Sequence, residues 1–351
     1  MARVAVIAGD GIGKEVIPAG MDVVKKAAAA CGASVQFVEF PWGCDFYHRH
    51  GKMMDDDGFE RLREFDAIYL GAIGDPSVPD HISVWQLILP IRQRFDQYVN
   101  LRPMRLVAGA TTPLAGRGPS DIDMVCVREN SEGEYAGIGG RLHKGTPHDV
   151  AQQVSVMTRR GIERIARYAF EMASKRPRRL LASATKSNAL QYTMVLWDDV
   201  LEAVAKEYPS VAWRKYHVDA LVARMVTDPG SIDVIVASNL FGDILTDLGA
   251  AVSGSLGIAP SGNINPERLY PSMFEPIHGS APDIAGKGLA NPIGAIWAGA
   301  LMLDHLDARA GHDLIVGAIE RVLSGNGPRT PDLGGRATTR QVADAILQEL
   351  K

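Results

Sequence analysis

The chain has 351 residues, which at about 150 residues per domain favours two domains, and its composition is that of a globular protein with a sizeable core. A formal charge of −4 without like-charge blocks argues against nucleic-acid binding and against binding to a membrane surface. Three widely spaced cysteines indicate neither a disulfide frame nor a zinc site. No stretch resembles a secretory signal or is long enough to span a bilayer, so we expect a cytoplasmic protein.

Short apolar runs alternate with helix-length amphipathic segments along the chain. The predicted strands cover residues 4–9, 35–40, 66–72, 122–129, 179–186 and 233–240. Two of the helical patterns between them end at helix breakers, Gly32 and Pro177. The alternation predicts an α/β fold with a largely parallel or mixed sheet. Stretches rich in Gly, Pro and Ser are expected to be long loops at 107–121, 136–149, 254–266 and 325–336.

The first candidate motif is GDGIG at residues 9–13, between a predicted strand and a predicted helix. A Rossmann fingerprint needs GxGxxG, and the third glycine is wrongly spaced here. A tight strand-to-helix turn is therefore favoured over a phosphate-binding loop by about two to one.

Two carboxylates lie four residues apart in ASNLFGDILTDLG, at Asp243 and Asp247. In a helix they share one face and repel each other, which a divalent cation with oxygen ligands would offset. An exposed helix face is the alternative interpretation. The apolar strand that precedes the pair favours a site, because sites in α/β proteins gather where strands end.

Three arginines lie near expected strand-to-loop transitions: Arg92 in LPIRQRFDQY, Arg102 in NLRP and Arg128 in VREN. If they converge, they suit a di- or tricarboxylate, although a single arginine usually forms a surface ion pair. Tyr135, in a Gly-rich loop, is a candidate proton donor. Lys186 ends an apolar strand, where burial can lower its pKa towards that of a general base.

A long polar loop over residues 273–292 leads into an apolar helix. Its composition suits a nucleotide held by backbone groups, with Asp283 available to accept hydrogen bonds from ribose hydroxyls. A single histidine in such a loop, here His278, is more often structural.

Seven motifs occur in order along the whole chain, and together they resemble the β-decarboxylating dehydrogenases, the isocitrate and isopropylmalate dehydrogenase family. They are GDGIGKEV, NLRP, VRENSEGEYAG, the Lys-Ser-Asn of SATKSN, HVDA, NLFGDILTDL and EPIHGSAPDIAGKGLANP. The finer pattern is most similar to the tartrate dehydrogenase/D-malate dehydrogenase branch.

The resemblance implies two α/β domains that share one twisted mixed sheet, a fold that is not a Rossmann fold. It assigns residues 1–98 plus 254–351 to a large NAD-binding domain and residues 99–253 to a domain for substrate, metal and dimerisation. It also implies a homodimer with sites shared between subunits, and the cofactors NAD, Mn²⁺ or Mg²⁺, with K⁺ suggested by the tartrate dehydrogenase branch.

The resemblance further implies a role for each candidate residue. Tyr135 and Lys186 would be catalytic, and Arg92, Arg102, Arg128 and Asp219 would bind the substrate. The metal ligands would be Asp219, Asp243 and Asp247, with Asp219 and Lys186 coming from the neighbouring subunit. The cofactor contacts would be Ile12, Asn188, His278, Gly279, Ser280, Ala281, Asp283 and Asn291.

The expected reaction is oxidation with β-decarboxylation of a small 2-hydroxy dicarboxylate, D-malate or tartrate. Isocitrate would place its third carboxylate beside Gln86 and Ile88, where family members that use isocitrate carry serine and asparagine. Trp85 is bulkier than the acidic residue of isopropylmalate enzymes and is expected to fill the pocket for the C3 substituent. The alternatives are a 3-isopropylmalate dehydrogenase and, in a different class, a non-catalytic carboxylate-sensing subunit. The latter is disfavoured because no candidate catalytic residue is missing.

Overall fold

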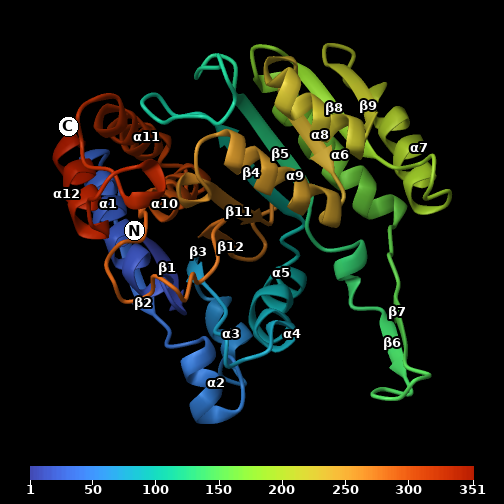
Figure 1. The fold of residues 1–351 in the computed structure, drawn as a ribbon, viewed down its shortest axis with the longest axis horizontal. Helices are drawn as coiled ribbons and strands as arrows, with labels where there is room; N and C mark the ends of the chain where they lie inside the picture. Colours follow the sequence, from blue (N-terminus) through green and yellow to red (C-terminus); the bar gives the residue numbers. More distant parts are fainter.

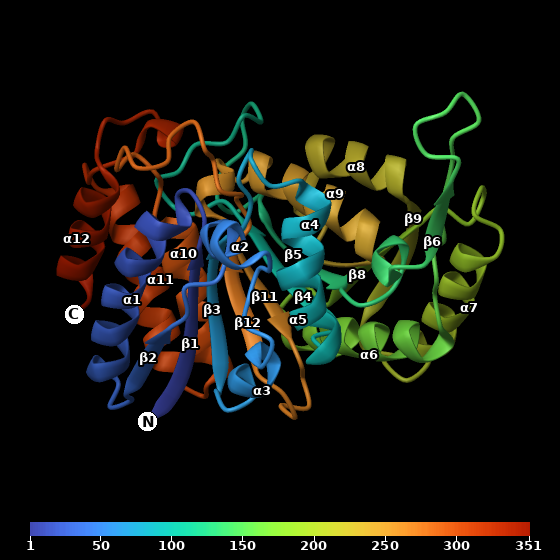
Figure 2. The same cartoon turned by 90° about the horizontal axis from the view of Figure 1, so that it is seen from below.

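Ten strands form one continuous mixed sheet in this computed structural model, which describes residues 1–351 (Figures 1 and 2). Across the sheet the strands are β2 (Val35–Glu39), β1 (Ala2–Gly9), β3 (Ala67–Ala72), β12 (Ser272–Pro276), β11 (Pro260–Ile264), β4 (Val99–Arg105), β5 (Asp123–Glu129), β10 (Val234–Ala237), β8 (Leu180–Thr185) and β9 (Ala212–His217). The predicted fold class, an α/β protein with one shared mixed sheet and no Rossmann topology, is confirmed.

Two parallel blocks of strands run in opposite directions. Strands β2, β1, β3 and β12 are parallel, as are β5, β10, β8 and β9. Between the blocks, β11 and β4 pair in antiparallel fashion with their neighbours, and the three antiparallel pairings reverse the strand direction. The chain therefore crosses between the two halves of the molecule more than once.

Helices cover both faces of each block, so the strands are buried on both sides. Around the first block lie α1 (Gly13–Ala30), α10 (Ile293–His305), α11 (Arg309–Ser324) and α12 (Thr339–Glu349) on one face, and α2 (Cys44–His50), α3 (Gly58–Leu62), α4 (Asp80–Ser83) and α5 (Leu89–Arg94) on the other. Around the second block lie α6 (Arg159–Lys175) and α7 (Thr193–Ala205), opposite α8 (Val218–Thr227) and α9 (Asn239–Val252).

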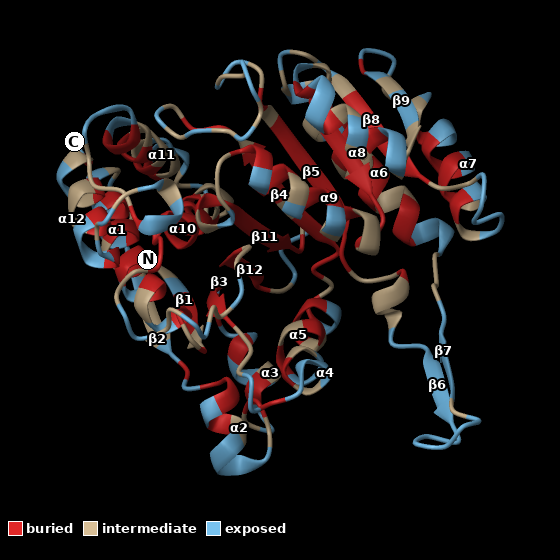
Figure 3. Ribbon diagram, viewed as in Figure 1, coloured by how far each residue is buried: buried red, intermediate tan, exposed pale blue.

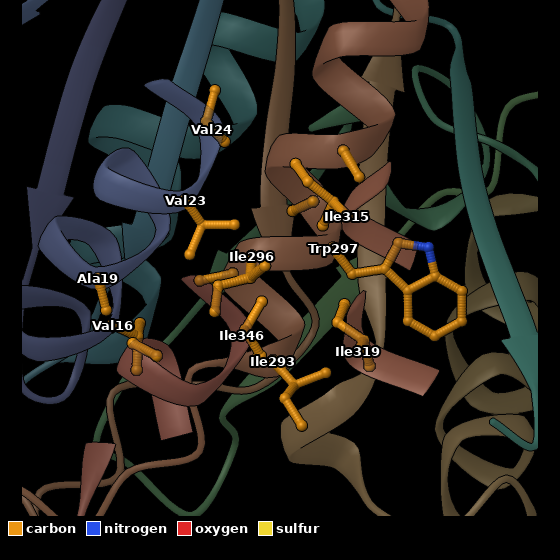
Figure 4. Close-up of a cluster of buried hydrophobic side chains, with 14 of the residues drawn as sticks. Val16, Ala19, Val23, Val24, Ile293, Ile296, Trp297, Ile315, Ile319 and Ile346 are labelled. Carbon is orange, nitrogen blue, oxygen red and sulfur yellow. The ribbon is translucent and has the colours of Figure 1, made fainter. Parts of the chain in front are cut away.

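The largest apolar core joins α1 to the C-terminal helices, as the side chains in Figure 4 show. Val16 and Val24 of α1 pack with Ile296 of α10 and Ile346 of α12, although they lie far apart in the sequence. Both ends of the chain thus belong to one half of the molecule. The division at 98/99 and 253/254 stays a prediction, because a single sheet runs through both halves.

Three of the expected loops contain strands, and in the loop expected over residues 273–292 the first four residues belong to β12. Residues 260–264 of the expected loop at 254–266 form β11, a buried strand in the middle of the sheet. Its polar residues are tolerated there because their side chains are paired. For example, the side-chain oxygen Oδ1 of Asn263 accepts hydrogen bonds from the Nδ2 atoms of Asn100 and Asn130. Part of 136–149 forms β6 (Gly139–Leu142), which pairs with β7 (Val150–Gln153) in an exposed ribbon that projects from the molecule (Figures 1 and 3).

The sequence-based strands otherwise agree with the structure to within a few residues. Strands β4, β9 and β12 were not expected. None of the helices has the length and apolar character needed to cross a membrane. The three cysteines are free, and Cys44 and Cys126 are buried.

Candidate active site

Three buried arginines converge at the centre of the molecule. Arg92 lies in the last turn of α5, while Arg102 of β4 and Arg128 of β5 share one face of the sheet as diagonal neighbours. Burial and the nearby charge of Arg102 lower the pKa of Arg128 to about 10, and Arg92 contributes to the same effect. Three crowded, buried cations of this kind require anionic partners.

Asp243 of α9 supplies one of these negative charges. It accepts hydrogen bonds from Arg128 and from the Tyr135 hydroxyl, the latter at 3.1 Å, and Arg102 Nη1 lies 3.4 Å away. Burial alone would raise the pKa of Asp243, but Arg128 and Arg102 outweigh it and hold that pKa below its usual value. Asp243 is therefore a carboxylate at neutral pH.

Asp247 follows one helical turn later and is exposed in the single chain. Partial burial and the nearby charge of Asp243 outweigh Arg102 and raise the pKa of Asp247. This is the like-charge pair expected from the sequence, and its repulsion favours a bound cation.

Neighbouring polar side chains fix the arginines and were missed by the sequence reasoning. Asn239 Oδ1 accepts from Arg128 Nη2 at 2.7 Å, and Thr246 Oγ1 accepts from Arg102 Nη1 at 2.7 Å. Both residues belong to the same motif as Asp243 and lie on the face of α9 that covers the arginines. Their helical spacing from Asp243, four residues before it and three after it, could have identified them. The Arg92 and Arg102 guanidinium groups are only partly held, because the Nε atom of each is buried without a partner. Such donors are suited to a ligand carboxylate.

Tyr135 occupies a short 3₁₀ turn, Glu134–Ala136, beside these charges. Its ring centroid lies 5.6 Å from the Arg128 guanidinium. Burial and the Asp243 charge raise the pKa of Tyr135, against a smaller opposing effect of Arg128. The hydroxyl therefore keeps its proton at neutral pH and is available as a donor.

Lys186 and Asp219 form a separate pair away from this cluster. Lys186 follows β8, Asp219 lies in the first turn of α8, and Nζ is 2.8 Å from Oδ1. The hydrogen bond from Lys186 lowers the pKa of Asp219. A single chain contains no group of three or more His, Cys, Asp or Glu side chains placed to hold a metal ion. The three expected metal ligands are thus not assembled within one subunit.

A separate cavity of about 630 Å³ lies between the first turn of α1 and the loop after β12. Four of the expected cofactor residues line it: Ile12, His278, Ala281 and Asn291. Gly279, Ser280 and Asp283 belong to the same loop without lining the cavity, and Asn188 lies in the other half of the molecule, just after Lys186.

The glycine-rich turn at residues 9–13 contacts the loop after β12 that lines this cavity. The Ile12 amide donates to the Ser280 carbonyl at 2.9 Å, and a Cβ on Gly11 would lie only 2.0 Å from that oxygen. Only glycine permits this close approach, since Gly11 also has a positive φ of 48°. The GDGIG motif is therefore a tight turn, as favoured from the sequence, and it fixes the position of the loop that follows β12.

One carboxylate that lines the cavity, the exposed Asp332, was not predicted from the sequence. Asp332 accepts hydrogen bonds from Ser255 Oγ at 2.6 Å and from Asn291 Nδ2 at 2.9 Å. His278 Nε2 is buried and has no partner, and burial lowers the pKa of His278, so its ring is neutral. The cavity thus has largely apolar walls and a few polar atoms that can bind a ligand.

Comparison with known proteins agrees with this geometry. The sequence profile of the isocitrate/isopropylmalate dehydrogenase family matches residues 3–346. The chain belongs to this family. It is therefore an oxidoreductase, and the resemblance inferred from the seven motifs is confirmed.

Among the relatives of this dehydrogenase, the D-malate dehydrogenase [decarboxylating] of Escherichia coli (strain K12) is 58% identical, covering 99% of this chain and 98% of that protein. The tartrate dehydrogenase/decarboxylase of Pseudomonas putida is 53% identical, covering 99% and 97%. The crystal structure of isocitrate dehydrogenase from Methylococcus capsulatus superposes with a TM-score of 0.89 at 35% identity, covering 100% of this chain and 99% of that chain.

Proposed function

We propose that this dehydrogenase oxidises a small 2-hydroxy dicarboxylate, D-malate or a tartrate, with NAD as the hydride acceptor and with loss of CO₂. The observation that carries the proposal is the group of three buried arginines beside a protonated tyrosine, two of which, Arg92 and Arg102, have an Nε without a partner. The names of the relatives at 53–58% identity agree with a four-carbon substrate.

The chain's own residues have distinct roles in this reaction. Arg92, Arg102 and Arg128 would bind the two substrate carboxylates through charge-assisted hydrogen bonds. Lys186 would remove the proton from the substrate's hydroxyl oxygen while hydride leaves the carbon that bears this hydroxyl. After CO₂ departs, Tyr135 would donate its proton to the enol carbon, a role that suits a hydroxyl whose pKa is raised.

The acidic residues fit a divalent cation. Asp243 and Asp247 offer hard oxygen ligands one helical turn apart, and partial burial together with the nearby charge of Asp243 raises the pKa of Asp247. Mn²⁺ or Mg²⁺ held there, when bound, would polarise the substrate's hydroxyl oxygen as a Lewis acid. The third ligand would be Asp219 of a second copy.

The cavity beside the loop after β12 fits the adenosine half of NAD. Its volume of about 630 Å³ suits a small-molecule ligand, and the unpartnered His278 Nε2 and the Asp332 carboxylate offer polar contacts.

A homodimer would complete the site. Within one chain, Lys186 bonds to Asp219, and the three expected metal ligands are not assembled; apolar side chains are also exposed on the same half of the molecule. These exposed residues are Val226 on α8, Ile244 on α9, and Ile138, Leu142, Val150 and Val154 on or beside the β6–β7 ribbon (Figure 3). Burying such surface is the usual basis of a twofold interface.

A substrate panel tests the reaction. NADH absorbance is recorded with NAD, Mn²⁺ and each of D-malate, tartrate, 3-isopropylmalate and isocitrate. D-malate or tartrate should have the highest kcat/KM. A higher value for 3-isopropylmalate would assign the chain to that activity, and no turnover with any of them would favour the carboxylate-sensing subunit.

Complementation between two inactive variants tests the shared site. Tyr135→Phe and Lys186→Ala are co-expressed so that mixed dimers form. A site built from both subunits gives each mixed dimer one intact site, so about a quarter of wild-type activity should return. A site contained in one subunit would give no recovery.

A further inference from the structure

A π-helical turn interrupts the helix that carries Arg92. Between α4 and α5, residues Val84–Ile88 form this turn, and the Leu89 amide bonds to the Val84 carbonyl five residues earlier. Pro90 accounts for it: proline has no N–H to offer the Gln86 carbonyl, and its ring would clash with that carbonyl in a regular helix. Such turns are frequent at functional sites.

The turn presents Trp85 to the loop that carries Tyr135. The indole is 38% exposed, and a Cβ built on Gly137 would lie 3.0 Å from both Cζ3 and Cη2 of its ring. Gly137 has a positive φ of 75°, so both its conformation and the neighbouring indole favour glycine. A second contact from the same helix is the hydrogen bond from Gln93 Nε2 to the Tyr135 carbonyl at 3.2 Å.

The two contacts hold the Tyr135 turn at two points, Tyr135 itself and Gly137. The helix that makes them also carries Arg92, which belongs to the arginine group, while the Tyr135 hydroxyl lies on Asp243 in the same group. The contact between Trp85 and Gly137 therefore sets the separation between the elements that carry Arg92 and Tyr135.

We propose that the Trp85–Gly137 contact positions Tyr135 for proton transfer. The inference rests on the proposed function and deepens it. Trp85 and Gly137 are positioning residues, because they act through the Tyr135 turn.

A double-mutant cycle tests the contact. Wild type, Trp85→Ala, Gly137→Ala and the double variant are compared by kcat and KM for D-malate and for 3-isopropylmalate. Gly116→Ala is the matched control, since Gly116 also has a positive φ, 70°, but no atom lies within 4 Å of its added Cβ.

Gly137→Ala should lower kcat for D-malate about tenfold with a smaller change in KM, and Gly116→Ala should stay within about twofold of wild type. Trp85→Ala should lower kcat about fivefold in the wild-type background and have little further effect in the Gly137→Ala background. Trp85→Tyr, which keeps a long aromatic ring, should recover much of the loss in kcat.

The proposal is wrong if the effects of Trp85→Ala and Gly137→Ala on kcat simply multiply in the double variant. It is also wrong if Gly137→Ala and Gly116→Ala lower kcat equally. The thermal unfolding midpoints of the same four proteins give a second cycle that needs no substrate. If wild type oxidises no acid of the panel, the proposed function and the positioning role are both wrong. If wild type is active and neither cycle shows coupling, the inference alone is wrong.

Discussion

Glu275 of β12 forms a buried ion pair with Arg92 of α5, with 2.7 Å between Oε1 and Nη2 and both side chains about nine-tenths buried. Asn263 Nδ2 donates to the same carboxylate oxygen at 2.7 Å. Glu275 thus fixes one edge of the guanidinium, while Arg92 Nε remains without a partner. This arrangement orients Arg92 towards a ligand without using all of its donors.

Glu275→Gln should therefore weaken substrate binding. The amide keeps a hydrogen-bond acceptor but removes the charge, so Arg92 becomes a buried cation without its anion, a change that costs about 3–5 kcal/mol in folding stability. We expect KM for D-malate to rise at least tenfold with a smaller change in kcat, measured by steady-state NADH formation.

Glu267→Gln is the control for this prediction. Glu267 accepts a hydrogen bond from Tyr98 in the segment between β11 and β12, with no contact to the arginine group. If KM for D-malate is unchanged in Glu275→Gln as well as in Glu267→Gln, Glu275 does not orient Arg92.

The sequence identified the charged residues of the site but not the side chains that hold them. Arg92 and Glu275 are 183 residues apart, and Arg128 and Asn239 are 111 apart. Such pairings depend on strand order, which local periodicity cannot supply. Asn239 was within reach because it belongs to the motif of Asp243, whereas Glu275 precedes a loop and has no periodic signal.

The strands at the centre of the sheet were the other omission. Strand β11 reads PSGNI and lacks an apolar run, so propensity predicts a loop. Its place between β12 and β4 and the paired Asn263 side chain override that propensity. By contrast, the apolar runs of β1 and β10 were located correctly because strands buried on both faces are continuously apolar.

A divalent cation should be required for turnover. Asp243 and Asp247 form a like-charge pair on one face of α9, and Asp247 has no hydrogen-bond partner of its own. Chelation should abolish NADH formation, and Asp247→Asn should raise the Mn²⁺ concentration needed for half-maximal rate at least tenfold. Asp228→Asn, at the exposed end of α8, should behave as wild type.

Thermal unfolding gives a check on the metal prediction that is independent of activity. Because a ligand that binds only the folded state stabilises it, Mn²⁺ should raise the midpoint of wild type more than that of Asp247→Asn. Full activity of a metal-stripped preparation would contradict the assignment.

His305 should make folding stability sensitive to acid. Its ring lies 5.4 Å from the Phe274 ring, and burial together with the charge of Arg268 lowers its pKa from 6.5 to about 4. Between these values the unfolded chain binds the proton more tightly, so the free energy of unfolding falls as pH decreases from 6.5 to 4. The loss can reach about 3 kcal/mol at 1.36 kcal/mol per pKa unit.

Urea unfolding at several pH values and one fixed protein concentration measures this effect. His305→Gln should flatten the pH dependence between 6.5 and 4, whereas His148→Gln, on the exposed hairpin between β6 and β7, should not. An unchanged slope in His305→Gln would assign the acid sensitivity to other groups.

NAD should be preferred over NADP by a large factor. Family members that use NADP tend to carry lysine and tyrosine where this chain has Asp283, and a carboxylate there would accept hydrogen bonds from the ribose hydroxyls and repel a 2′-phosphate. The cavity adds a second carboxylate, Asp332, which Ser255 and Asn291 hold in place. Asp283 and Asp332 are therefore alternative candidates for the carboxylate that contacts the ribose hydroxyls and repels a 2′-phosphate.

Two variants separate these roles. Asp283→Ser should reduce the ratio of kcat/KM for NAD to that for NADP at least tenfold, because it removes both the acceptor and the repelling charge. Asp332→Asn should weaken both cofactors alike, since Asp332 is tied to Ser255 and Asn291 within the cavity wall. If Asp332→Asn changes the ratio and Asp283→Ser leaves it unchanged, then Asp332 faces the ribose. Equal efficiency of the wild type with both cofactors would show that neither carboxylate discriminates between them.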